Sequence, residues 1–264
     1  MLPRRRRVVR SVEARLDRLL VSAYSTDLAS DGDAIMDTAL VVTGIAGVAF
    51  CVSHLGLSSR QARGRLVDFL GEKGFLGFYT LVALLTLAAM IVAYAKAAHT
   101  VQLWWLGLGA RHLPLLVMPV ALTLIAGGII APNPSVTGME NALDRPDPAR
   151  GVLRITRHPM MWGIALWAAV HLLVNGDLAS LLFFGSFLLT AVLGSLHLDD
   201  RMRIAHGERW QRFAAVTSYL PFAAILRGRQ TLVWSELRRP VGWGVGLFAL
   251  LLLLHPYLFG VRPY

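Results

Sequence analysis

The sequence predicts an all-α integral membrane protein, a polytopic bundle of about six transmembrane helices preceded by a basic amphipathic helix. Of its 264 residues, 55% are hydrophobic and only 16% are charged, whereas soluble domains are about 45 to 50% apolar. The apolar residues gather in separate runs, each close to the roughly 20 residues that cross about 30 Å of hydrocarbon. The sequence lacks the alternating strands of about ten residues that a membrane barrel needs, so each run is expected to be a helix.

The first 37 residues form a basic N-terminal segment unlike the rest of the chain. Between Arg4 and Tyr24, apolar residues recur at helical spacing among arginines, which is typical of a helix lying on a membrane surface. A signal peptide is not expected, because no uninterrupted apolar stretch follows the arginines before Ser25. Residues 38–264 are expected to form a single transmembrane domain.

Six apolar runs make up this domain, and each predicts one helix: residues 38–57, 75–97, 113–131, 160–175, 178–196 and 242–260. The fourth run is short and forms a helical hairpin with the fifth. Its turn is expected at Asn175, Gly176 and Asp177, residues that tolerate left-handed backbone and cap a following helix. Small residues such as Gly244 in the last run allow close packing within or between chains, so the oligomeric state stays open.

Lys and Arg residues are concentrated in three of the predicted loops. The loops 57–74, 132–159 and 197–241 carry 4, 4 and 8 Lys and Arg residues. The intervening loops and the tail carry few, so the positive-inside rule places these three loops in the cytoplasm and the N-terminus outside. The net charge of +10 comes without any nucleic-acid motif, which indicates anionic membrane lipids rather than nucleic acid as the partner. A bacterial inner membrane is the expected location.

Histidines inside apolar runs are the first sign of a functional site, because ionisable groups are expensive in lipid. His54, His171 and His255 lie within the predicted spans. A neutral imidazole bonded to a neighbouring helix explains any one of them, and the alternative is ligation of a metal or of haem iron. Trp167 and Asn175 share one helix face with His171, since the three follow at intervals of four, and either a site or ordinary interface anchoring explains that face.

A second candidate site opens the fourth run. Arg154, Arg157 and His158 stand together there, and two guanidinium groups with an imidazole suit an anion such as a haem propionate, phosphate or carboxylate. Anchoring to lipid headgroups is the alternative. Asp199 and Asp200 are conspicuous in a basic loop. They are expected to pair with the arginines of the loop 132–159, to orient a cofactor, or to pair with arginines beside them.

Several of these segments occur in the order found in one known family. Gly151–Gly163 (GVLRITRHPMMWG), HGERW at 206–210 and PFAAILRGRQ at 221–230 resemble the NnrU family, which includes the 15-cis-zeta-carotene isomerases; FCVSHLGLSS at 50–59 agrees more weakly. The resemblance implies a haem b within the membrane domain, with His54 and His171 as axial ligands. It also implies cis-trans isomerisation of a polyene, a hydrophobic substrate that enters from the bilayer. Ala168 stands where the isomerases carry a cysteine.

Depth within the bilayer complicates that ligand pair. His171 lies about 20 Å along its helix from His158, whereas His54 is close to the predicted cytoplasmic end of the first span. Either the fourth span is tilted, or the first span begins later, or this chain uses other ligands.

Two other functions stay open. The order of the motifs also resembles the isoprenylcysteine carboxyl methyltransferases, which use S-adenosylmethionine. A non-enzymatic accessory role in nitrite and nitric oxide metabolism is the second alternative, implied by the association of the NnrU family with denitrification.

Overall fold

The structure is a computed structural model that describes residues 38–136 and 138–263. Most of these residues are helical. The expected amphipathic helix of the N-terminal segment lies outside the described residues. The first described helix is Thr38–Leu57. The others follow in chain order: α2 (Arg60–Lys96), η1 (Leu108–His112), α3 (Leu113–Ile130), η2 (Glu140–Asp144), η3 (Gly151–Arg154), α4 (Pro159–Asn175), α5 (Leu178–Val216), α6 (Ala223–Leu226) and α7 (Trp234–Phe259).

All six predicted spans are helices. Thr38–Leu57, α2, α3, α5 and α7 are long and apolar enough to cross a bilayer, and α4 is the shorter apolar helix that the fourth run predicted. Many large apolar side chains point outward from these helices; Val41, Leu85, Leu116 and Leu253 are examples. Such a surface is stable only against lipid. The predicted all-α membrane bundle is therefore confirmed.

Several helices extend well beyond the predicted spans. α2 begins at Arg60, although the sequence predicted a loop as far as Gly74, and α5 continues to Val216 rather than ending near 196. Gly71 and Gly207 have positive φ inside these helices and break each of them into two pieces. At 1.5 Å per residue the stretch from Leu178 to Leu198 is already about 32 Å long, which matches the hydrocarbon thickness. The polar residues from Asp199 onward therefore lie beyond the hydrocarbon.

The predicted hairpin turn between α4 and α5 is confirmed. Gly176 adopts the left-handed conformation at φ 68°, and Asp177 caps α5 by accepting a hydrogen bond from the backbone N–H of Ser180. A side chain at Gly176 would lie 2.3 Å from the Trp104 carbonyl oxygen, so the segment between α2 and η1 can cross the turn only because the residue is glycine.

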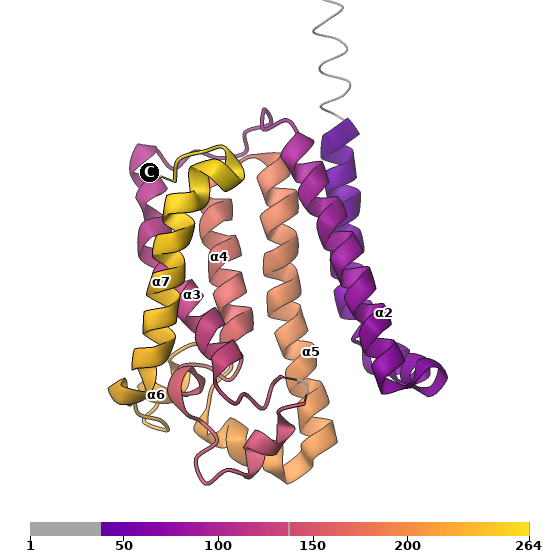
Figure 1. Cartoon of the computed structure of the whole chain (residues 1–264), viewed down its shortest axis with the longest axis vertical. Coiled ribbons are helices and arrows are strands. Elements are labelled where there is room, and N and C mark those ends of the chain that lie inside the picture. Colours follow the sequence, from indigo (N-terminus) through magenta and orange to yellow (C-terminus); the bar gives the residue numbers. More distant parts are fainter. Residues whose placement is uncertain (1–37, 137, 264) are drawn as a thin grey trace, which may run out of the picture.

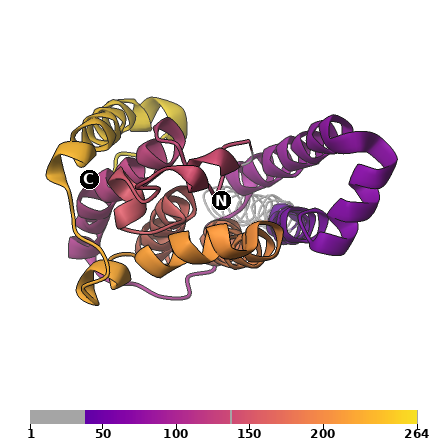
Figure 2. The same ribbon diagram turned by 90° about the horizontal axis from the view of Figure 1, so that it is seen from below.

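The helices form a body and an arm. α3 packs against both α4 and α7, and α4 packs against α5. The helix Thr38–Leu57 and α2 make the arm, which leans on the body at α5 and projects to one side when the bundle is seen along its length (Figure 2). The three arginine-rich loops gather at one end of the bundle, while the α4–α5 turn and the C-terminus lie at the other (Figure 1).

Candidate functional site

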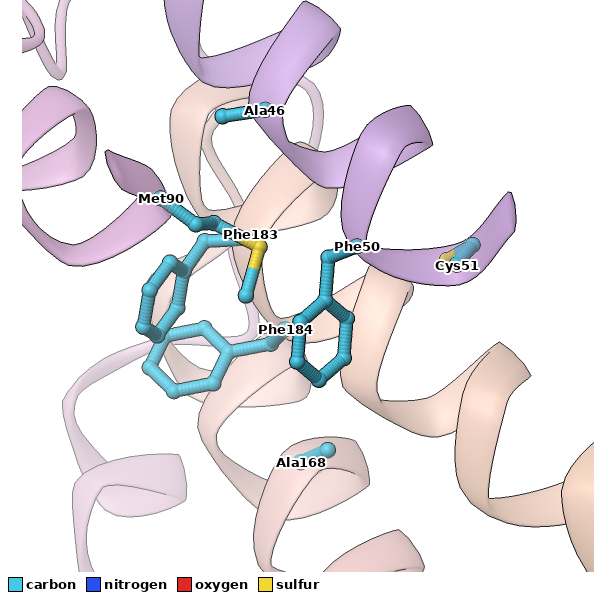
Figure 3. Close-up of a cluster of buried hydrophobic side chains, with 7 residues drawn as sticks. All are labelled: Ala46, Phe50, Cys51, Met90, Ala168, Phe183 and Phe184. Atoms are coloured by element: carbon cyan, nitrogen blue, oxygen red, sulfur yellow. The ribbon is translucent and has the colours of Figure 1, made fainter. Parts of the chain in front are cut away.

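An aromatic cluster fills the seam between the arm and the body. Its buried members come from four different helices, as Figure 3 shows: Ala46, Phe50 and Cys51 from the first helix, Met90 from α2, Ala168 from α4, and Phe183 and Phe184 from α5. Trp167 and Phe187 pack against these residues. The cluster is apolar and dry, which is the kind of surrounding in which an imidazole without a charged partner stays neutral.

His171 lies against this cluster on α4. Its ring stacks on Phe184, with 5.2 Å between ring centroids and 27° between planes, and contacts Trp167 at 5.7 Å. Its Nδ1 lies 2.8 Å from the Trp167 carbonyl oxygen. Because a carbonyl can only accept, Nδ1 carries the hydrogen, and the neutral ring keeps a free lone pair on Nε2. Metal-binding histidines commonly have this arrangement.

His54, on the helix Thr38–Leu57, has the same arrangement. Its Nδ1 lies 2.8 Å from the Phe50 carbonyl oxygen, so its Nε2 also keeps a lone pair. Its ring contacts Phe50 at 4.0 Å and Tyr79 at 5.8 Å. A third imidazole, His255 of α7, donates through Nδ1 to the Val261 carbonyl at 2.8 Å. Each of these rings therefore offers the donor atom that haem iron needs.

The structure does not bring His54 and His171 together. The rings of Phe50, Phe187 and Trp167 form a continuous series of contacts between them. Positions along α5 give the separation, because His171 stacks on Phe184 while Leu55, next to His54, lies against Gly194. Ten residues of helix are about 15 Å, whereas two axial nitrogens at bond lengths of about 2 Å lie about 4 Å apart. Shared ligation by this pair requires the arm to shift along α5, and it stays a prediction.

Hydrogen bonds between successive turns of α4 connect the three residues of its predicted face. The Asn175 side chain donates to the His171 carbonyl at 2.8 Å, just as His171 bonds to the Trp167 carbonyl. Trp167 turns into the aromatic cluster, where it packs on Phe184 and Phe187. Asn175 is instead exposed at the end of the helix, where its own carbonyl accepts from Gln102. Trp167 and His171 thus belong to the cluster, and Asn175 secures the helix end behind them.

Ala168 is completely buried in the cluster. The lone cysteine, Cys51, belongs to the same cluster but donates its S–H to the Ser186 carbonyl and accepts from Thr190. No group of three or more His, Cys, Asp or Glu side chains gathers anywhere in residues 38–136 and 138–263. A metal held by protein ligands alone needs such a group, whereas haem iron takes four of its ligands from the porphyrin and one or two from histidine.

The predicted anion site at the start of α4 is a polar cap, by which we mean the ion-paired side chains Arg154, Arg157, His158, Asp199 and Glu236. The Arg154 guanidinium donates to Glu236 at 2.8 Å, to Gln230 at 2.7 Å and to Asp147 at 2.6 Å. Glu236 also accepts from the backbone N–H of Gly151 at 2.7 Å. Carboxylates of the chain itself thus engage the guanidinium that was expected to hold an external anion, and its role toward a propionate stays a prediction.

Asp199 joins Arg157 and His158 across the cap. Both guanidinium arms of Arg157 donate to its carboxylate, and the His158 Nε2 lies 2.9 Å away. His158 is buried, and burial lowers its pKa, so the ring is neutral at pH 7 and donates its Nε2–H. Burial by itself would raise the pKa of Asp199, yet the hydrogen bonds from His158 and Arg157 outweigh it and lower the pKa to about 2. Asp200 pairs locally with Arg203, so both expected kinds of pairing occur.

Sequence reasoning missed two parts of this arrangement. Glu236, at the start of α7, is the main partner of Arg154 and was not singled out. At the opposite end of the bundle, His99 bonds to Asp177 at 3.0 Å, Asp177 to the Ser180 hydroxyl at 2.7 Å, and that hydroxyl to Tyr94 at 3.0 Å. The available signals were an acidic residue in the first turn of a helix and a histidine whose partner is an aspartate cap. Neither signal identifies its partner, because the two residues of each pair lie about 80 positions apart in the sequence.

Comparisons with known proteins agree with the motifs. The sequence profile of a family described as NnrU protein matches residues 42–263, which is nearly all of the transmembrane domain. The chain is 27% identical over 203 residues to 15-cis-zeta-carotene isomerase, chloroplastic, of Zea mays, covering 75% of this chain and 54% of the relative. It is 28% identical over 188 residues to the protein of the same name from Arabidopsis thaliana, covering 69% and 50%. The chain therefore spans about half the length of the curated relatives it matches. No solved structure matches it.

Proposed function

The chain belongs to the NnrU protein family, and from this premise we propose that it is a haem b-binding membrane protein that isomerises a cis double bond of a polyene drawn from the bilayer. One observation carries the proposal: His171 presents a free Nε2 beside an apolar aromatic cluster inside the membrane domain. The named relatives are isomerases of 15-cis-zeta-carotene, and a polyene of that kind is the substrate class we propose here.

In this proposal some residues of the chain hold the cofactor and others contact the substrate. The carbonyl of Trp167 fixes the tautomer and orientation of His171, so that Nε2 is the ligating atom. Phe184, stacked on His171, and Trp167 hold the ring in place from the sides. Phe50, Phe183 and Phe187 provide flat apolar surfaces that suit a conjugated chain.

Haem, when bound, supplies one-electron or Lewis-acid chemistry that no side chain in this cluster provides. The protein excludes water from the double bond, because the cluster residues Met90 and Ala168 are completely buried. Asn175 and the Asp177 cap keep the end of α4 in place beside His171. A bacterial inner membrane is the location we propose, although the two named relatives are chloroplastic.

An absorption spectrum of the purified protein, expressed with an adequate haem supply, tests the proposal. We expect a Soret band that shifts or disappears in His171→Ala. The band should be unaffected in His206→Ala, whose imidazole lies in the distant part of α5. His54→Ala and His255→Ala identify the second histidine that would bind the iron, because only the variant that lacks this histidine should change the low-spin spectrum. A protein that shows no Soret band contradicts the proposal.

Methyl transfer from S-adenosylmethionine stays the alternative enzyme activity. The acidic residues Asp199 and Asp200 are paired within the chain, Asp199 with Arg157 and His158 and Asp200 with Arg203. Calorimetry with S-adenosylmethionine tests it directly, and we expect no heat of binding. Carotenoid profiles and growth on nitrite, compared in a deletion strain, separate the isomerase from the accessory role.

A further inference from the structure

A pocket lined with arginines lies on the end of the bundle that carries the polar cap. Its volume is about 490 Å³, and its lining includes four arginines, Arg145, Arg154, Arg212 and Arg229, and one acidic residue, Asp147. Phe213 and Val216, from the last turns of α5, contribute to its apolar wall together with Leu143 and two prolines. A concave site with a strong excess of positive charge and one apolar side is suited to an anion with an organic substituent.

Three of the four arginines are not neutralised by close carboxylates. Arg145 has no side-chain partner within the described residues, and Arg229 donates to the Ala215 carbonyl at 2.7 Å. Arg212 is 3.9 Å from Glu208, and both of these side chains are largely exposed. Such a pair contributes little. Arg154 differs, because Glu236, Gln230 and Asp147 fix it, and it serves as the rigid base of the pocket.

The neighbourhood of the pocket indicates how deep it lies. The segment that follows α5 exposes apolar side chains beside the arginines, including Leu220 at 54% and Leu226 at 84% exposure. Exposed leucines next to arginines are typical of protein surface at the level of lipid headgroups, where apolar tips enter the membrane and guanidinium groups meet phosphates. After Gly207 the chain of α5 turns across the lower end of the bundle (Figure 1), and Phe213 and Val216 of this part of α5 line the pocket.

We propose that this arginine pocket binds a phosphate group, carried by an anionic phospholipid headgroup or by a soluble phosphate ester, with the depth of the pocket favouring the lipid. Guanidinium groups bind phosphate through paired N–H donors. Arg145 is free to close on the phosphate, and Arg229, which donates to one carbonyl oxygen, keeps further N–H donors for it, while Arg154 stays in place. The apolar wall at Phe213 and Val216 then meets the glycerol or other organic part of the ligand. This site is separate from the aromatic cluster and does not depend on the proposed function.

Lipid retention by the full-length protein tests the site. The protein is purified in detergent, mixed with phosphatidylglycerol or phosphatidylcholine, and examined by native mass spectrometry. We expect preferential retention of phosphatidylglycerol, weakened by about a hundredfold in the double variant Arg145→Gln/Arg229→Gln, because each of the two charge-assisted hydrogen bonds that are lost weakens binding by about tenfold. Arg145→Lys/Arg229→Lys should restore part of the retention. Circular dichroism and the melting temperature verify that the variants are folded.

The matched control removes the same charge outside the pocket. Arg227→Gln/Arg238→Gln takes two arginines from the same end of the bundle, neither of which lines the pocket. It should retain phosphatidylglycerol as the wild type does. Equal loss in both double variants, or no loss in the pocket variant, overturns the proposal.

Calorimetry with inorganic phosphate distinguishes the two sources of the phosphate group. Binding of millimolar inorganic phosphate that depends on Arg145 and Arg229, without preferential retention of phosphatidylglycerol, assigns the site to a soluble ester. Preferential retention of phosphatidylglycerol that depends on the same two arginines assigns the site to the lipid. Binding of neither probe overturns the proposal.

Discussion

Asp199, on α5, is hydrogen-bonded to the residues that precede α4. Its carboxylate accepts hydrogen bonds from both Arg157 and His158, about 40 residues earlier in the chain, and only about a fifth of it is exposed. A buried carboxylate with two cationic or donor partners is costly to disturb, because each partner is left without its counterpart. The start of α4, and with it the depth of His171, depends on this residue.

Asp199→Asn should lower the free energy of unfolding by about 3 kcal/mol, since it leaves the buried Arg157 charge without a carboxylate. Asp200→Asn is the matched control, because the neighbouring carboxylate makes only an exposed pair with Arg203 and should change stability by less than about 0.5 kcal/mol. Thermal unfolding of both variants in the same detergent measures the difference. Equal melting temperatures for the two variants would contradict this assignment.

The pH dependence follows from the same carboxylate. Its pKa falls from 3.8 to about 2 on folding, so the folded state holds fewer protons than the unfolded state in this range. The stabilisation is complete above pH 3.8 and is lost as the pH falls toward about 2; it amounts to about 2.5 kcal/mol. The stability difference between the wild type and Asp199→Asn should therefore narrow across that window. A difference independent of pH would mean that the carboxylate is not ionised in the folded protein.

At the scale of whole elements, close approach between helices depends on a few glycines. A side chain at Gly244 of α7 would lie 2.4 Å from the Thr123 hydroxyl and 2.5 Å from the Thr123 backbone on α3. The backbone there cannot move without separating the two helices. Lipid-embedded helices associate through such small residues, because lipid tails provide no hydrophobic drive for packing.

Gly244→Ala should therefore destabilise the protein by about 1 to 3 kcal/mol, by forcing α3 and α7 apart. Gly242→Ala, two residues earlier on the same helix, meets nothing within 4 Å. It should be neutral or slightly stabilising, because alanine is the better helix former. Resistance to unfolding by a denaturing detergent compares the two. The contact is not the constraint we describe if Gly244→Ala is as stable as the wild type.

Which features the sequence could predict depends on the environment of each element. The six helices were predictable because lipid requires every backbone group in an apolar run to bond within its own segment. That requirement ends at the membrane surface, so the extensions of α2 and α5 left no apolar signal. The turn at Gly176 and Asp177 was predictable from local backbone chemistry alone. The partnership of Arg154 with Glu236 was not, because only the folded bundle brings the two together.

For the whole molecule, the distribution of charge predicts one orientation. The loops 57–74, 132–159 and 197–241 share one end of the bundle, and the C-terminus lies at the other (Figure 1). The arginines of these loops should keep that end in the cytoplasm. The polar cap and the arginine pocket would then both face the cytoplasmic leaflet, where anionic lipids are available.

Reporter fusions in a bacterial host check this orientation. Alkaline phosphatase should be inactive when fused at residue 228, in the loop 197–241, and active when fused after residue 263. A green fluorescent protein at the same two positions should give the reverse pattern. Activity of both phosphatase fusions, or of neither, would show that the charge distribution does not set the topology.

The arm adds a consequence for how molecules from the membrane reach the aromatic cluster. The helix Thr38–Leu57 supplies Phe50 to that cluster, and the arm packs on the body mainly along α5 and through the cluster residue Ala168 of α4. A sideways swing of the arm would part the seam toward the acyl chains without unpacking α3, α4 and α7. An apolar molecule dissolved in the bilayer would then reach the cluster from the side, without crossing water.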